Sequence, residues 1–194
     1  MTYLLLDTET GGTDPLQHPL LQIGVLLLDD DLKLLEARQW NLSDFDAQAV
    51  DPKALFYNGL SLATLRYTGH DKQTVYHQLL DLIKHYAPIY PGTQKRQRLH
   101  VAGWNVGSFD VRFVHQAMRK EVWDEFCNYS TFEVQTVAHL CQRLGYLPRE
   151  LRGLSEFAEY FGIKQTHVAL DDAFTTCRVW EQCESLLKKG VNKE

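Results

Sequence analysis

Closely spaced cysteine pairs are missing from this sequence of 194 residues, which contains four cysteines in all. None of them stands in a C-x-x-C pair, so the sequence gives poor support for a zinc site. Unpaired cysteines usually pack in the interior as small apolar side chains. We therefore expect four reduced, partly buried thiols: Cys127, Cys141, Cys177 and Cys183.

Long apolar runs are missing as well. The apolar start from Met1 to Leu6 is too short for a signal peptide, has no basic residue and leads directly into Asp7. No stretch approaches the roughly 20 apolar residues that a membrane-spanning helix needs. We expect no membrane association and a soluble, cytoplasmic protein.

Positive charge is not in excess, because 20 Lys and Arg residues stand against 25 Asp and Glu residues, for a formal net charge of −5. This balance argues against a protein that coats nucleic acid by bulk attraction. It does not argue against an enzyme that binds a few nucleotides, because two divalent cations would bring positive charge to the place where a phosphate binds.

The sequence has no linker, internal repeat or low-complexity stretch, which predicts a single domain over residues 1–194. Apolar runs predict strands at 3–7, 20–28, 32–42 and 99–103, with an acidic hairpin turn at 29–31 rather than a metal site. Helical spacing predicts a short helix from about 51 and further helices at 72–86, 109–118, 133–144, 154–160 and 169–188, the last ended by Gly190. Three neighbouring strands followed by helices around a fourth predict an α/β fold with a mixed sheet.

Two acids end the first strand. Asp7 and Glu9 are two residues apart, so they project from the same face of that strand. Two neighbouring carboxylates near an interior strand repel each other and lose hydration, and a bound cation would offset both costs. The Gly11–Gly12 pair that follows gives a turn that a ligand can approach closely. A purely structural pair remains the alternative.

A third acid lies in the segment from Asn105 to Asp110, where the fourth strand ends and a helix begins. Asp110 in the first helical turn could serve only the helix dipole. The end of a strand is also where sites collect in open α/β sheets, which favours a functional role.

A histidine and a fourth acid precede and begin the last helix. His167 comes just before it, while Asp172 lies on it beside a stripe formed by Ala169 and Ala173. Small residues let a helix pack closely, so we expect Asp172 to turn inward and its neighbour Asp171 to face elsewhere.

Four carboxylates and one histidine at three segment ends suit two divalent cations. Oxygen ligands favour Mg²⁺ or Mn²⁺, and a pair of such ions is suited to phosphodiester hydrolysis. A neutral imidazole at His167 could then accept a proton from the attacking water.

With these motifs, the sequence resembles the DEDDh branch of the DnaQ-like 3′→5′ exonucleases, which includes RNase T and the proofreading subunit of DNA polymerase III. The resemblance runs from Asp7 to about Trp180 and rests on D-x-E-T and H-x-A-x-x-D-A in the family order. It implies an RNase H-like fold with a mixed five-stranded sheet flanked by helices. It also implies two Mg²⁺ or Mn²⁺ ions per site, cleavage at single-stranded DNA or RNA 3′ ends, and release of 5′-mononucleotides. The residues that match the family's metal ligands are Asp7, Glu9, Asp110 and Asp172, and His167 matches its general base.

The resemblance also suggests contacts with the substrate. The residues we expect to make them are Thr10, Gly11, Leu60, Asn105 and Phe109. Leu60 could equally be a core leucine. The second motif has one residue more than is common between Asn105 and Phe109, and Glu133 resembles an acid of RNase T-like members.

Several alternatives stay open. A non-catalytic nucleic-acid-binding protein on the same fold is one. An aspartyl-phosphate enzyme is disfavoured because Asp7-Thr8-Glu9 lacks the D-x-D pattern. A homodimer or a polymerase partner would be compatible with the family. For the basic residues of two loops, a solvated face is favoured over phosphate contact: Lys95, Arg96 and Arg98 in one loop, Arg149 and Arg152 in the other.

Overall fold

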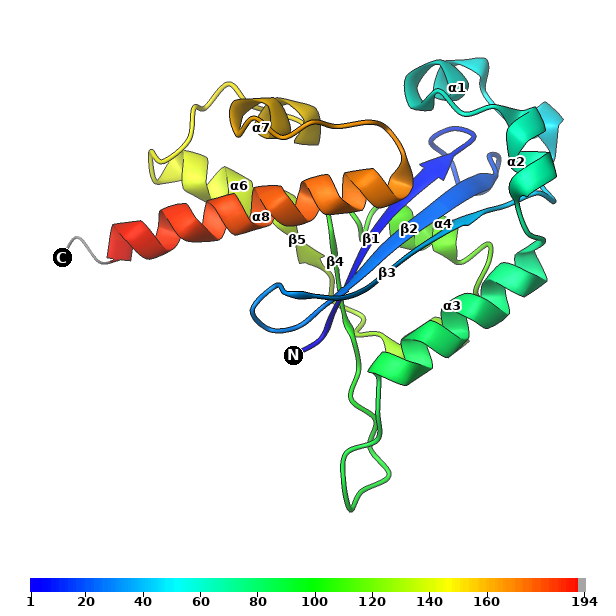
Figure 1. Ribbon diagram of the computed structural model, residues 1–194, viewed down its shortest axis with the longest axis horizontal. Helices are drawn as coiled ribbons and strands as arrows, with labels where there is room; N and C mark the ends of the chain where they lie inside the picture. Colours follow the sequence, from blue (N-terminus) through cyan, green and yellow to red (C-terminus); the bar gives the residue numbers. More distant parts are fainter. Residues whose placement is uncertain (192–194) are drawn as a thin grey trace.

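The computed structural model describes residues 1–191, and a five-stranded sheet stands at its centre (Figure 1). The strand order is β3-β2-β1-β4-β5. The first three strands are antiparallel, whereas β4 runs parallel to β1 and β5 parallel to β4. The strands are β1 (Tyr3–Thr10), β2 (Leu20–Leu28), β3 (Leu34–Asn41), β4 (His100–Gly103) and β5 (Phe132–Glu133). The mixed sheet predicted from the sequence is confirmed.

Helices cover both faces of this sheet. They are η1 (Ala47–Ala49), α1 (Pro52–Asn58), α2 (Leu62–Thr68), α3 (Lys72–Tyr86), α4 (Asp110–Val114), α5 (Lys120–Phe126), α6 (Val134–Arg143), α7 (Leu154–Tyr160) and α8 (Ala169–Val191). The helices α2 and α5, the 3₁₀ turn η1 and the short strand β5 were missed in the sequence.

Two predicted helix ends were wrong. The helix expected over 109–118 ends at Val114, where the amides of Gln116 and Ala117 bond three residues back in tight turns. The last helix does not end at Gly190 but continues to Val191. Glycine is common just beyond helix ends, yet inside a helix it costs only about 1 kcal/mol, which long-range packing can offset.

The side chains of β1 point alternately to the two faces of the sheet, so the interior has two layers. Leu4 and Leu6 pack into a core with α3 and α4, while Tyr3 and Leu5 pack into a second core with α8. All nine residues of β2 are buried because the strand lies between two others and is covered on both faces. The odd-numbered side chains at the end of β1 therefore point toward the start of α8.

The cysteines, the helices and the first basic loop can each be compared with what the sequence predicted. All four cysteines are free and buried. Within residues 1–191, no helix is long and apolar enough to cross a membrane. In the first basic loop, the Arg96 guanidinium donates to the Ala87 carbonyl at 2.7 Å and lies over the Phe126 ring, so this arginine has a structural use.

Candidate metal centre

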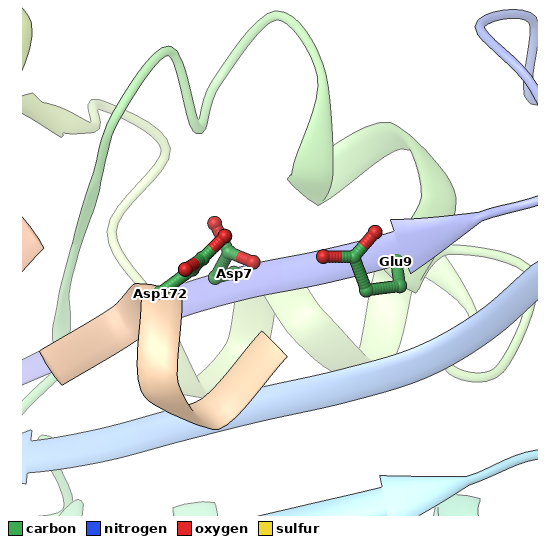
Figure 2. Close-up of side chains that lie close together, drawn as sticks. All are labelled: Asp7, Glu9 and Asp172. Carbon is green, nitrogen blue, oxygen red and sulfur yellow. The ribbon is translucent and has the colours of Figure 1, made fainter. Parts of the chain in front are cut away.

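Three carboxylates converge where β1 meets the first turn of α8. Asp7, Glu9 and Asp172 each offer a ligand atom, and these atoms all lie within 4.8 Å of one another. Figure 2 shows Asp7 and Glu9 projecting from the same side of β1, with Asp172 reaching them from the helix. The two-residue spacing predicted this pairing on β1, and the inward turn predicted for Asp172 is seen, since its side chain is almost fully buried.

A close approach of α8 to the sheet brings Asp172 to this position. Asp7 pairs with Gly24 on β2, and a Cβ atom placed on Gly24 would lie 2.3 Å from the Ala169 carbonyl carbon. Only a glycine leaves room for the helix here. The Gln22 side chain accepts the Ala169 amide at 2.8 Å, which satisfies one of the free donors of the first helical turn. The helix start is thereby fixed over the acidic end of β1.

Burial and mutual repulsion make these acids reluctant to ionise. Burial raises the pKa of Asp7 well above its usual value, and the nearby Asp110, Asp172 and Glu9 raise it further. Burial also raises the pKa of Glu9 to about 8 and that of Asp110 to about 7. The pKa of Asp172 is raised by burial too, against the lowering effect of hydrogen bonds. Without positive charge, the centre is therefore electrostatically unfavourable at neutral pH.

Asp110 lies beside this cluster rather than in it. Its Oδ1 accepts the Thr8 amide at 2.8 Å and the Thr8 hydroxyl at 2.6 Å. The Thr8 amide is available because β4 pairs with β1 only as far as Leu5, which leaves this edge of β1 open. The structure thus brings together three of the four predicted acids and ties the fourth to the residue between Asp7 and Glu9. Thr8 was not among the predicted site residues, although its place between two acids was a usable signal.

Glu133 holds the loop that carries Asn105. Its carboxylate accepts the Val106 amide at 3.0 Å, the Gly107 amide at 2.9 Å and the Thr131 hydroxyl at 2.9 Å. Asn105 itself adopts a left-handed conformation with φ 61°, a conformation that asparagine tolerates better than most residues. These contacts show how Glu133 fixes the turn between β4 and α4.

The segment before α8 surrounds Asp172. The Gln165 side chain donates to Asp172 Oδ2 at 2.9 Å, and His167 Nδ1 lies 3.7 Å from the same oxygen. The His167 side chain is 53% exposed, and its backbone is left-handed with φ 55°. Asp171 points away, is exposed, and accepts the Thr166 hydroxyl at 2.6 Å. Nothing in the sequence had pointed to Gln165.

A groove opens beside Glu9. Its volume is about 340 Å³, and its lining includes Phe109, Tyr57, Asn58 and Thr10 together with Glu9. The Tyr57 side chain is 75% exposed, while the Phe109 ring packs on Phe113. A groove with aromatic walls next to a carboxylate can hold a flat, partly apolar group.

Leu60 and Gly11, two of the other predicted substrate contacts, have structural surroundings, while Thr10 both lines the groove and makes a local hydrogen bond. Leu60 packs against a cluster that includes Leu21 and Phe45, and it is not among the residues that line the groove. Gly11 is buried, and its amide and carbonyl are both used in backbone hydrogen bonds. Thr10 donates through its hydroxyl to the Gly12 carbonyl at 2.6 Å. Tyr57 and Asn58, three and two residues before Leu60, line the groove in its place and were not predicted as contacts.

The donor set fits a divalent cation. Asp172 Oδ1 is buried and has no hydrogen-bond partner among the described residues. Buried oxygens of this kind normally have a partner, so a free carboxylate oxygen within a group of three acids is what a metal site requires. Oxygen ligands alone favour Mg²⁺ or Mn²⁺ over softer metals.

Comparison with known proteins places this geometry in a known fold. No protein-family model matches the chain, and no curated protein matches its sequence. Solved structures do match. E. coli exonuclease I in complex with a dT13 oligonucleotide superposes with a TM-score of 0.75 at 16% identity, over 99% of this chain and 43% of that one. A zinc-bound E. coli exonuclease I–single-stranded DNA complex gives a TM-score of 0.73 at 17% identity, over 97% of this chain and 42% of that one.

A further structure of exonuclease I gives a TM-score of 0.73 at 18% identity, over 93% of this chain and 42% of that one. This chain therefore spans less than half the length of these exonuclease I chains. Identity this low establishes the architecture alone. With its mixed five-stranded sheet and flanking helices, the chain has the RNase H-like fold of exonuclease I.

Proposed function

We propose that this chain is a metal-dependent 3′→5′ exonuclease of the DEDDh type, acting as one domain on single-stranded nucleic acid. The observation that carries the proposal is the cluster of Asp7, Glu9 and Asp172 beside an aromatic groove. The fold likeness to exonuclease I supports it, since two of the matched structures are complexes with single-stranded DNA or a dT13 oligonucleotide. The finer assignment to the RNase T and proofreading-subunit type rests on the sequence motifs, among which Glu133 resembles an acid of RNase T-like members.

Each group has a defined task in this proposal. Asp7, Glu9 and Asp172 would hold Mg²⁺ or Mn²⁺, with Asp110, bonded to Thr8, as the fourth acid. Two bound divalent cations supply the positive charge that activates water and stabilises the leaving oxygen in phosphodiester hydrolysis. His167, exposed and close to Asp172, accepts the proton of the attacking water. The products are 5′-mononucleotides.

In this proposal, the groove beside Glu9 explains why cleavage starts at the 3′ end. In the proposal, the base of the 3′-terminal nucleotide occupies the space between Phe109 and Tyr57, so that its phosphodiester lies over the carboxylates. Asn58 lines the same groove and donates through its amide to the Thr10 carbonyl at 3.3 Å, so it lies beside the space proposed for the terminal nucleotide. A strand without a free 3′ end could not enter in this way.

Digestion of end-labelled strands tests the proposal. Single-stranded DNA and RNA oligomers of the same sequence, labelled at the 5′ end, are incubated with Mg²⁺, Mn²⁺ or EDTA. We expect a ladder that shortens stepwise from the 3′ end with either metal and no reaction in EDTA. A circular single strand and a 3′-phosphorylated strand serve as controls and should resist.

Two results would reject the proposal. Cleavage of the circle would identify an endonuclease. Tight strand binding without any metal-dependent cleavage would favour the non-catalytic binding protein. The rates on DNA and RNA give the preferred substrate in the same experiment.

A further inference from the structure

Three arginines gather around a second concave surface, away from the carboxylates. A cavity of about 710 Å³ is lined by Arg143 of α6, by Arg149 and Arg152 of the following loop, and by His139 and Gln142. Among the described residues, no carboxylate lines it. Because the chain as a whole carries a net charge of −5, this local positive charge departs from the average surface.

The fold gives little structural reason for this charge. Within residues 1–191, none of the three guanidinium groups takes part in a salt bridge. Arg143 lies in the last turn of α6, where the helix dipole favours a cation. The dipole does not account for Arg149 and Arg152, which lie beyond the helix in the loop. Unpaired guanidinium groups around one cavity suit an anion that bonds to several of them.

Hydrogen bonds from α6 fix the loop that carries two of these arginines. Gln142 is buried on α6, and its amide donates to the Pro148 carbonyl at 2.6 Å and to the Leu151 carbonyl at 2.9 Å. Leu151 also packs against the core cluster beneath α7. Arg149 and Arg152 are therefore presented from a fixed backbone, which lowers the entropy cost of binding a ligand.

One face of α6 connects this cavity to the candidate metal centre. Thr136, His139 and Arg143 are three and four residues apart, so they lie along the same side of the helix, and all three are exposed. Thr136 also lines a groove of about 440 Å³ together with Asn105 and Glu133. That groove lies on the loop between β4 and α4, which leads into Asp110 at the start of α4. In Figure 1, α6 starts next to β5 and runs alongside α8 away from this end of the sheet.

We propose that the cavity binds the phosphodiester backbone of a single strand whose 3′ end is at the carboxylates. This inference rests on the proposed function. The helix has ten residues and is about 15 Å long at ~1.5 Å per residue. At ~3.4 Å per stacked nucleotide, the helix alone spans about four nucleotides, so the arginines would contact the backbone at least about four nucleotides from the cleaved end. Guanidinium groups pair with phosphate in a bidentate manner, which suits this task.

The double variant Arg149→Ala/Arg152→Ala tests the proposal. Binding of a fluorescein-labelled oligomer of about 15 nucleotides is measured by anisotropy in EDTA at several salt concentrations. The variant should bind at least about tenfold more weakly, and the slope of log K against log salt should fall by about 1.4, since each single-strand phosphate contact contributes ~0.7. With Mn²⁺, KM for this oligomer should rise while kcat stays nearly unchanged.

Substrate length and charge provide the controls. A dinucleotide cannot reach the cavity, so its cleavage should be the same for wild type and variant. Arg149→Lys/Arg152→Lys keeps the charge and should keep most of the salt slope. Lys33→Ala/Arg38→Ala removes two charges at β3, at the other edge of the sheet, and should leave binding unchanged.

The outcomes separate this inference from the proposed function. Unchanged affinity and salt slope in the double variant would overturn it. An Asp- and Glu-rich peptide that binds wild type but not the variant, while oligomer binding is equal, would also overturn it and assign the cavity to an acidic protein segment. If neither protein cleaves any strand but only the variant loses oligomer binding, the strand site holds and the exonuclease proposal fails.

Discussion

At the residue scale, neighbouring acids on α8 have different surroundings. Asp172 is 5% exposed and belongs to the carboxylate cluster, while Asp171 is exposed and hydrogen-bonded to Thr166. The difference follows from helix geometry, because adjacent residues are about 100° apart around the axis. The side chain that shares a face with Ala169 and Ala173 is drawn toward the sheet.

This difference predicts unequal effects of the same substitution. Asp172→Asn should lower the exonuclease rate by about 10³-fold or more, because it removes a carboxylate from the metal centre. Asp171→Asn should change the rate less than about threefold. Single-turnover cleavage of a labelled oligomer with Mn²⁺ measures both. If Asp171→Asn has the larger effect, the assignment of the third motif is displaced by one residue.

His167 combines an exposed ring with an uncommon backbone conformation. Its φ of 55° would strain an alanine, whereas asparagine tolerates this region. His167→Asn should therefore lower the rate by about 10²–10⁴-fold, the usual loss for a general base, without disturbing the loop. Calorimetric titration with Mn²⁺ provides the control and should give nearly wild-type affinity. A loss of affinity as large as that of Asp7→Asn would make His167 a ligand or an anchor instead.

At the element scale, the meeting of α8 with the sheet decides the geometry of the centre. Gly24 lies opposite Asp7 in the β1–β2 pairing and in contact with the first turn of α8. A methyl group there would push the helix outward and move Asp172 away from Asp7. A displacement of about 1 Å at a catalytic group can cost about 10²-fold in rate.

Gly24→Ala should thus impair both activity and stability. We expect a rate loss of about 10²-fold and a decrease in the free energy of unfolding of about 1–3 kcal/mol, the range for overpacking. Cleavage assays and urea denaturation measure the two effects. Gly153→Ala is the matched control, since a Cβ atom there meets nothing within 4 Å, and it should be close to neutral. Wild-type activity in Gly24→Ala would show that the helix start can shift without consequence.

At the scale of the whole molecule, the carboxylate cluster concentrates acidic groups in a chain that is already acidic. The pKa values of Asp7, Glu9, Asp110 and Asp172 are all raised, chiefly by burial, so ionising them costs free energy in the absence of cations. Ligands that bind only the folded state increase its stability by mass action. The buried acids therefore lower the free energy of unfolding of the metal-free protein, and bound metal would raise it again.

Thermal unfolding tests this balance. Mn²⁺ at about 100 times its Kd should stabilise the wild type by about 2.7 kcal/mol, and EDTA should remove the gain. Asp7→Asn should raise the metal-free Tm by about 2–4 °C, equivalent to about 1 kcal/mol, because one buried charge is gone. The same variant should lose most of its response to Mn²⁺. Equal responses in both proteins would place the metal elsewhere.

The local pattern of the chain determined much of the fold and most of the centre. The apolar run before Asp7 made β1 an interior strand, and the period of two put Asp7 and Glu9 on one face. The alanines around Asp172 turned that acid inward. These features depend on neighbours within one strand or one helical turn, so they can be predicted from the sequence alone.

Tertiary structure decided the remainder, because it depends on residues distant in the chain. The bond between Asp110 and Thr8 spans 102 positions, and the capping of Ala169 by Gln22 spans 147. Tyr57 instead of Leu60 lines the groove because of how α1 packs over the end of β1. The arginines around the far cavity come from the end of α6 and from the loop after it, and only the cavity lining shows that they share one surface. Long-range contacts of this kind produce no periodic pattern or motif in the sequence, because the residues next to each partner in the chain do not take part in them.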